Sequence, residues 1–259
     1  MPALEVENVS LQFGGVKALV DVTYHIEKGE IFSLIGPNGA GKTSMLNCIS
    51  GLYSPSQGSI KFMGKDIINM KPHKRTNLGI SRAFQNIALF SQMSVLDNLK
   101  LGRHTKMKSG LLSGGLYWGA AQKEEVAHRK AVEEVIDFLE LKDIRHTPVG
   151  RLPYGLQKRV EVGRALALQP ELILLDEPMA GMNSSEKQDM ARFILDMNAL
   201  QDMTVVLIEH DMGVVMDLSD HIAVLDFGKL IGFGTPEEIK ENEAVISAYL
   251  GEEEDEEVS

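Results

Sequence analysis

The residues best suited to chemistry begin in a glycine-rich segment, residues 36–43, which fits the pattern G-x-x-x-x-G-K-[ST]. It follows an apolar run at 31–35 and precedes a helical pattern at 42–50. Glycines let the backbone curl until its N–H groups face phosphate oxygens, and the helix adds its positive end. This context predicts a nucleoside triphosphate site, with Lys42 on the β- and γ-phosphates and the Thr43 hydroxyl on Mg²⁺. A plain glycine turn with an exposed lysine is the alternative. The residues expected to surround the nucleotide here are Gly36, Pro37, Asn38, Gly39, Ala40, Gly41, Lys42, Thr43 and Ser44.

Two adjacent carboxylates, Asp176 and Glu177, close an apolar run at residues 172–175. Successive residues on a strand point to opposite sides, so we expect the two acids to have different roles. Asp176 is predicted to hold the Mg²⁺ shell through water, and Glu177 to face the γ-phosphate and polarise the attacking water. Two surface acids at a strand end are the alternative, which the phosphate-binding pattern disfavours.

A histidine, His210, follows a third apolar run at residues 204–208. In a parallel sheet the carboxyl ends of the strands meet at one edge, where ligands bind. We therefore expect His210 to hydrogen-bond the γ-phosphate and to lie against Glu177. A structural or simply exposed histidine is the alternative.

The elements that must position these residues alternate between short apolar runs and helical patterns. Strands that alternate with helices favour an α/β fold with a largely parallel central sheet. A hairpin turn is expected at Gly228 and Lys229. Strands are predicted at residues 4–9, 24–26, 31–35, 171–175, 205–208, 222–225 and 230–231.

A helical region interrupts this alternation, because residues 91–157 hold no run that suits a buried strand. Apolar residues at helical spacing predict an amphipathic helix over residues 122–141. We interpret the region as a helical subdomain inserted at about residues 88–160. Residues 106–121 are rich in Gly and Ser and hold Trp118, and they indicate a flexible excursion or a partner-contact loop.

Length and composition limit the class of protein. The 259 residues carry 26 Lys and Arg against 37 Asp and Glu, a formal net charge of −11. Six of the acids lie in residues 251–259, which indicates a solvated, disordered tail. The charge balance offers no basic surface for nucleic acid, and the single Cys48 excludes an internal disulfide. No run approaches the roughly 20 apolar residues of a membrane span, so any membrane role is expected to be peripheral.

In sequence order these motifs resemble the ATP-binding-cassette (ABC) transport ATPases. Gln85 matches the family's Q-loop glutamine, which touches Mg²⁺, and His210 matches its switch histidine. The signature-motif position falls on residues 152–157, ahead of an expected helix at 158–168. Phe13 lies where the family places a ring against adenine, although a buried core phenylalanine is the alternative. The resemblance makes the nucleotide-contacting residues of the signature Pro153, Gly155 and Gln157.

The signature departs from the usual Leu-Ser-Gly-Gly-Gln, because Pro153 replaces the serine and Tyr154 the first glycine. Proline has neither a hydroxyl nor an N–H to donate to an opposing γ-phosphate, which leaves the Gly155 N–H and the helix behind it. Asn183 stands where the D-loop usually has an aspartate. Together with residues 245–251, these features resemble the larger ATPase of bacterial branched-chain amino acid importers.

The resemblance runs over residues 4–250 and implies an α/β P-loop NTPase fold. That fold has a mostly parallel central sheet, an antiparallel β subdomain and an inserted α-helical subdomain. The resemblance assigns catalysis to Glu177, His210 and Gln85, and metal binding to Thr43, Gln85 and Asp176.

The same resemblance implies ATP and Mg²⁺ as cofactors and ATP hydrolysis coupled to solute transport. Its implied partners are integral-membrane permease subunits, a second ATPase subunit in a head-to-tail ATP sandwich and, indirectly, a substrate-binding protein, with no nucleic acid. It places the chain in the cytoplasm, peripheral on the inner face of the membrane. Urea import, lipopolysaccharide export, a soluble non-transport ABC switch and a P-loop kinase or GTPase are the alternatives.

Overall fold

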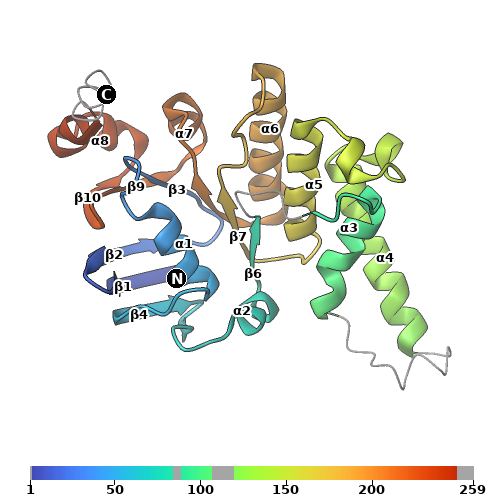
Figure 1. Ribbon diagram of the computed structural model, residues 1–259, viewed down its shortest axis with the longest axis horizontal. Helices are drawn as coiled ribbons and strands as arrows, with labels where there is room; N and C mark the ends of the chain where they lie inside the picture. The colour runs from blue at the N-terminus through green and yellow to red at the C-terminus, as the bar shows by residue number, and fades with distance from the viewer. Residues whose placement is uncertain (1, 84–88, 107–119, 250–259) are drawn as a thin grey trace.

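The computed structural model describes residues 2–83, 89–106 and 120–249 (Figure 1). Gln85, Trp118 and the acidic tail at 251–259 lie outside these ranges. Among the described residues, the larger of two sheets has six strands; its last two strands along the chain pair antiparallel and its other neighbours pair parallel. These strands are β3 (Ile31–Ile35), β6 (Ile80–Ala83), β7 (Leu172–Asp176), β8 (Thr204–Ile208), β9 (His221–Asp226) and β10 (Lys229–Gly234). Their order is β10-β9-β3-β8-β7-β6.

The central strands of this sheet are covered on both faces. Every residue of β3, β7 and β8 is buried, which is why their sequences read as continuous apolar runs. The predicted, mostly parallel sheet is thus confirmed. The predicted turn at Gly228 and Lys229 is one residue late, because Lys229 already begins β10. Phe227 and Gly228 form the turn, with the left-handed φ values of 42° and 77° that a tight hairpin needs.

The smaller sheet is antiparallel, in the order β2-β1-β4-β5. Its strands are β1 (Leu4–Phe13), β2 (Val16–Ile26), β4 (Gln57–Phe62) and β5 (Lys65–Asp66). The predicted strands at 4–9 and 24–26 are parts of β1 and β2, which extend further toward their shared hairpin. The antiparallel β subdomain is present, although β4 and β5 carry too few apolar residues to be predicted.

The helices differ from their predicted bounds mainly at their ends. The helix at Lys42–Ser50 has the bounds expected for it, whereas the one predicted over 122–141 ends at Phe138, and Glu140 then has a left-handed φ of 55°. The helix predicted to start at Lys158 starts at Tyr154, because Pro153 occupies the N-cap position and its fixed φ suits a helix start. None of the described helices combines the length and the apolar character that crossing a membrane requires. The helices and 3₁₀ turns are α1 (Lys42–Ser50), α2 (Pro72–Leu78), α3 (Val95–Gly102), η1 (Arg103–Lys106), α4 (Ala120–Phe138), η2 (Lys142–Ile144), η3 (Val149–Arg151), α5 (Tyr154–Leu166), α6 (Ser184–Gln201), α7 (Met212–Leu218) and α8 (Pro236–Lys240).

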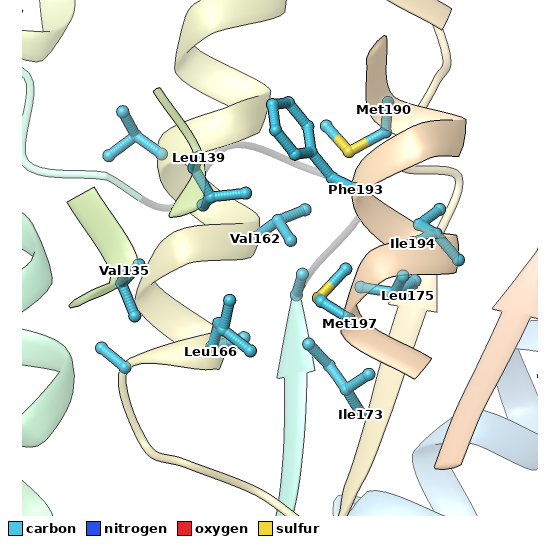
Figure 2. Close-up of a cluster of buried hydrophobic side chains, with 14 of the residues drawn as sticks. Val135, Leu139, Val162, Leu166, Ile173, Leu175, Met190, Phe193, Ile194 and Met197 are labelled. Atoms are coloured by element: carbon cyan, nitrogen blue, oxygen red, sulfur yellow. The ribbon is translucent and has the colours of Figure 1, made fainter. Parts of the chain in front are cut away.

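The helical insertion lies between β6 and β7 and contains α3, α4 and α5, on the right of Figure 1. Among its described residues the strand-like pairing is limited to an isolated bridge between Ser94 and Pro148. Figure 2 shows Val162 of α5 in one buried cluster with Phe193 of α6 and Leu175 of β7. This shared core fixes α5 against β7, which ends at Asp176, one residue before Glu177.

Candidate active site

The predicted phosphate segment forms a tight bend between β3 and the start of α1. Gly36 has a φ of 141° and Gly41 a φ of 104°, both in the left-handed region that favours glycine. A β-carbon on Gly36 would lie 1.9 Å from the Leu225 carbonyl oxygen, and one on Gly41 would lie 2.6 Å from the Ala18 carbonyl oxygen. The bend at residues 36–43 is called the cradle below. It needs glycine at Gly36 and Gly41, because backbone oxygens of neighbouring strands leave no room for a β-carbon there.

Lys42 is buried inside the bend. Its ammonium donates to the carbonyl oxygen of Gly36 and, at 2.9 Å, to that of Pro37. The loop thus holds the positive charge among the backbone groups that are expected to meet phosphate oxygens. Of the other predicted residues, Ala40 is buried, Ser44 is partly exposed, and the exposed ones are Asn38, Gly39 and Thr43.

Asp176 is buried at the end of β7, and its two carboxylate oxygens have different surroundings. Oδ2 accepts a hydrogen bond from Nη2 of Arg82 at 2.7 Å, and Nη1 of Arg82 also reaches Oδ1 of Asn47 at 2.6 Å. Oδ1 of Asp176 is buried and accepts no hydrogen bond from the described residues. Mg²⁺ prefers carboxylate and hydroxyl oxygens, so Asp176 and Thr43 fit a Mg²⁺ ion. Arg82 and Asn47 were not predicted as site residues.

Glu177 and His210 meet beside Asp176. Nε2 of His210 lies 2.7 Å from Oε1 of Glu177. Strands β7 and β8 set this contact, because they run parallel with Asp176 opposite Ile208, and the Glu177 N–H donates to the Ile208 oxygen at 2.9 Å. Glu177 then turns the chain with a left-handed φ of 51°, a conformation that costs a residue with a β-carbon about 1–2 kcal/mol.

Glu209 was not predicted as a site residue. Its carboxylate is buried, and it accepts the Met179 N–H at 2.8 Å through Oε1 and the His210 N–H at 3.4 Å through Oε2. Burial raises the pKa of the Glu209 carboxyl above its ordinary value, and the two N–H donors partly oppose that rise. The sequence did carry a signal, since an acid stands between a buried strand and the predicted histidine.

Phe13 lies at the end of β1 and is 46% exposed. Its ring meets the Tyr53 ring edge-on, with centroids 5.0 Å apart and planes at 73°. The alternative of a buried core phenylalanine is therefore wrong. A ring placed against adenine stays a prediction, and Tyr53 is a neighbour that the sequence did not reveal.

The signature residues gather at the start of α5. Pro153 is its N-cap, and the Gln157 side-chain amide donates to the Leu152 oxygen at 2.8 Å, so that amide serves its own helix start. Gly155 is buried against α6, where a β-carbon would lie 2.3 Å from Oε1 of Glu186. Figure 1 shows α1 and α5 on different sides of β6 and β7. Within one chain, α5 therefore lies apart from the helix that begins at Lys42.

Asn183, at the D-loop position, caps α6. Its side-chain oxygen accepts the Glu186 N–H, and the Glu186 carboxylate accepts the Asn183 N–H, both at 3.0 Å. The asparagine thus makes the hydrogen bonds of an N-cap without a charge. The Glu186 carboxylate both accepts from this cap and lies against Gly155, so it contacts the starts of α5 and α6.

Two families of known proteins match the sequence of this chain. The family described as ABC transporter matches residues 19–180, and the family described as branched-chain amino acid ATP-binding cassette transporter matches residues 229–255. The high-affinity branched-chain amino acid transport ATP-binding protein BraF of Pseudomonas aeruginosa is 39% identical over 254 residues. That similarity covers 97% of this chain and 98% of BraF.

Two solved structures share the fold. The ADP conformation of MJ1267, an ATP-binding cassette of an ABC transporter, has a TM-score of 0.84 and 33% identity over 97% of this chain and 99% of that one. The dimeric post-hydrolysis state of the ATP-binding cassette MJ0796, bound to ADP and phosphate, has a TM-score of 0.76 and 25% identity over 90% of this chain and 98% of that one. With the cradle and its paired carboxylates, these similarities show that the chain belongs to the ABC transporter family, as one of its ATP-binding cassettes.

Proposed function

We propose that this cassette is the ATP-hydrolysing subunit of a transporter that imports branched-chain amino acids through separate permease subunits. The observation that carries the hydrolytic role is the 2.7 Å contact between Glu177 and His210. It lies at the edge of the sheet where β3 leads into the cradle and β7 ends in Asp176. Ligands of α/β sheets bind at this carboxyl edge.

Each residue of the site has its own part in hydrolysis. The cradle N–H groups and Lys42 bind the phosphates and offset the charge that develops on the transferred group. Glu177 polarises the water that attacks the γ-phosphate and takes up its proton, while His210 holds that carboxylate in place. When bound, Mg²⁺ neutralises charge on the phosphate oxygens, and Thr43 and Asp176 would hold it.

Further assignments rest on the sequence motifs. Gln85 is proposed as an additional Mg²⁺ ligand and catalytic residue. Residues 4–250 are assigned to a single nucleotide-binding domain, with the helical subdomain inserted at about 88–160 and the acidic tail at 251–259.

Two cassettes are proposed to face each other head to tail with two ATP molecules between them. Because α1 and α5 lie on different sides of β6 and β7 in one chain (Figure 1), the Gly155 N–H serves the phosphate of an opposing cassette. The start of α5 adds further N–H groups and the positive end of its dipole. These groups offset the missing serine hydroxyl at Pro153. The dimeric MJ0796 cassette supports such a partner, either a second copy or a paralogue.

The cargo, the membrane partners and the location are proposed from the relatives. BraF is named for branched-chain amino acid transport, and the family that matches residues 229–255 has the same cargo in its description. We infer that permease subunits hold this cassette on the inner face of the membrane and that a substrate-binding protein delivers the amino acid to them.

Reconstitution tests this role. The tagged chain is isolated from membranes, its bound subunits are identified, and the complex is placed in liposomes with its binding protein. Leucine, isoleucine or valine uptake that requires ATP on the cassette side supports the proposal. Uptake of urea instead, export of lipopolysaccharide, or a chain that never associates with membrane subunits overturns it.

A further inference from the structure

The buried carboxylate of Glu209 joins the two segments of chain that carry Glu177 and His210. Its Oε1 accepts the Met179 N–H at 2.8 Å, and its Oε2 accepts the His210 N–H at 3.4 Å. Glu209 is only 5% exposed, so water does not readily replace either bond. One side chain therefore links the backbone just after Glu177 to the backbone at His210.

The chain after β7 needs this support because it leaves the sheet at once. The Glu177 N–H still donates to the Ile208 oxygen at 2.9 Å, but Glu177 has a left-handed φ of 51° and Pro178 has no N–H to donate. Met179 is the next donor, it is 1% exposed, and a buried N–H without an acceptor is costly. Glu209 supplies that acceptor from the end of the neighbouring strand.

We propose that Glu209 is a positioning residue for ATP hydrolysis, which acts through the backbone at 177–179 and at 210 to keep Oε1 of Glu177 2.7 Å from Nε2 of His210. This inference rests on the proposed hydrolytic roles of that pair. A carboxylate suits the task, because both of its oxygens accept hydrogen bonds and neither donates one.

Glu209→Gln in the full-length chain is the first test. Glutamine keeps the shape of the side chain but presents an NH₂ donor to one of the two N–H groups, so the segment must shift. A displacement of about 1 Å near the reacting atoms costs about 10²-fold in rate. We therefore expect kcat for ATP hydrolysis to fall by about 10- to 100-fold, while the dissociation constant for Mg-ATP stays at the wild-type value. Should Glu209→Gln fail to fold, Glu209→Asp, shorter by one methylene, takes its place.

Glu30 provides a matched control at the other end of the sheet. It is also a buried carboxylate, 7% exposed, which accepts the Glu27 N–H at 2.6 Å and contacts Nδ1 of His221 at 2.8 Å. It directly precedes β3 and so lies at the amino end of that strand, away from the cradle. Glu30→Gln should lower the melting temperature about as much as Glu209→Gln does and leave kcat at the wild-type value.

A second comparison separates positioning from a general loosening of the fold. In a Glu177→Ala chain the carboxylate that Glu209 positions is absent, so adding Glu209→Gln should leave the residual hydrolysis rate nearly unchanged. An equal fold-decrease in the wild-type and Glu177→Ala backgrounds overturns the positioning role. So does an equal decrease of kcat in Glu30→Gln.

The same set of variants distinguishes this inference from the proposed function. If Glu177→Gln abolishes hydrolysis while Glu209→Gln hydrolyses ATP at the wild-type rate, only the role of Glu209 is wrong. If Glu177→Gln itself hydrolyses ATP at the wild-type rate, the proposed catalytic pair is wrong, and the role of Glu209 is wrong with it.

Discussion

Arg82 and Asp176 form a buried ion pair, with 2.7 Å between Nη2 and Oδ2, that ties the edge strand β6 to the end of β7. The same guanidinium reaches Oδ1 of Asn47 on α1 at 2.6 Å. One arginine thus connects the helix behind the phosphate cradle with the strand that carries the proposed Mg²⁺ ligand. The two side chains are 7% and 1% exposed, so little solvent screens the pair.

Breaking this pair should destabilise the fold. Arg82→Met leaves the Asp176 carboxylate buried without its cation, and we expect the free energy of unfolding to fall by about 3–5 kcal/mol. The double variant Arg82→Met, Asp176→Leu should recover much of that loss. Urea-induced unfolding measures both variants. The control is Arg129, which is exposed and has its Nη2 3.8 Å from Oε1 of Glu125. Exposed ion pairs contribute little to the free energy of unfolding. A loss for Arg82→Met no larger than that for Arg129→Met would contradict the structural role of the pair.

The cradle predicts a difference between two glycines that both have left-handed φ values. A β-carbon added at Gly14, where φ is 55°, would meet no atom within 4 Å, so Gly14→Ala should cost about 1 kcal/mol from backbone strain alone. Gly36→Ala adds a contact of 1.9 Å with the Leu225 oxygen, which the loop can relieve only by moving. We expect Gly36→Ala to abolish saturable Mg-ATP binding in calorimetric titration and Gly14→Ala to preserve it. Unaltered affinity in Gly36→Ala would show that the cradle is not the phosphate site.

Asp211 should make stability depend on pH in the acid range. It accepts from Nζ of Lys187 at 2.7 Å and caps α7 through the Val214 N–H, and these bonds, the Lys187 bond first, lower the pKa of its carboxyl. The folded pKa lies below the unfolded value of about 3.9. The stabilising contribution is therefore present above about pH 4 and is lost as the pH falls through the lowered pKa.

Asp211→Asn removes this acid-range slope in unfolding free energy and keeps the cap, since asparagine is as good an N-cap as aspartate. Asp211→Ala should lose a further 1 kcal/mol or so at neutral pH, the usual contribution of a cap. Thermal unfolding between acid and neutral pH measures both effects. A slope in Asp211→Asn as steep as that of the wild type would assign the dependence to other groups.

The signature position distinguishes a nucleotide bound in trans from one bound by a single chain. Pro153 caps α5 without a side-chain hydrogen bond, so both Pro153→Asn and Pro153→Asp give the helix a better cap. The aspartate also puts a negative charge where the opposing γ-phosphate is expected. Like charges about 4 Å apart repel by about 1 kcal/mol in water and more in an interface, which predicts at least about tenfold slower hydrolysis by paired cassettes.

Matched measurements on the two Pro153 variants decide this point. ATP binding by the isolated chain should be the same in Pro153→Asn and Pro153→Asp, because the proposed arrangement puts the signature on the nucleotide of the opposing cassette. Slower hydrolysis should appear only in Pro153→Asp and only where cassettes pair. Weaker ATP binding by the isolated Pro153→Asp chain would place the signature against its own nucleotide instead.

Strands that are continuous apolar runs could be predicted from the sequence. A strand with a charged residue whose ion-pair partner lies far along the chain could not. Strands β3 and β7 read as apolar runs because both of their faces are buried. Strand β6 also belongs to the sheet and is largely buried, but it is short and contains Arg82. The partner of Arg82, Asp176, lies 94 residues further along the chain. No local pattern reveals that a charged residue will be neutralised from such a distance.

The same reason explains what was missed in the site. Motifs with fixed spacing contain Lys42, Asp176, Glu177 and His210. The parallel register of β7 and β8 then brings Glu177 and His210 together. The role of Glu209 depends on Met179, 30 residues earlier, and on how two strand ends align. Gln157 belonged to a recognised motif, yet its amide turned back to its own helix start, which only the geometry could show.

The central claim is that Glu177 activates the attacking water. Single-turnover hydrolysis of bound Mg-ATP, compared between the wild-type and Glu177→Gln chains, tests it most directly. We predict that Glu177→Gln binds Mg-ATP with the wild-type dissociation constant and cleaves it about 10²–10⁴-fold more slowly, the usual contribution of a general base. Cleavage by Glu177→Gln at the wild-type rate would contradict the assignment of Glu177, aligned by His210, as the group that activates water.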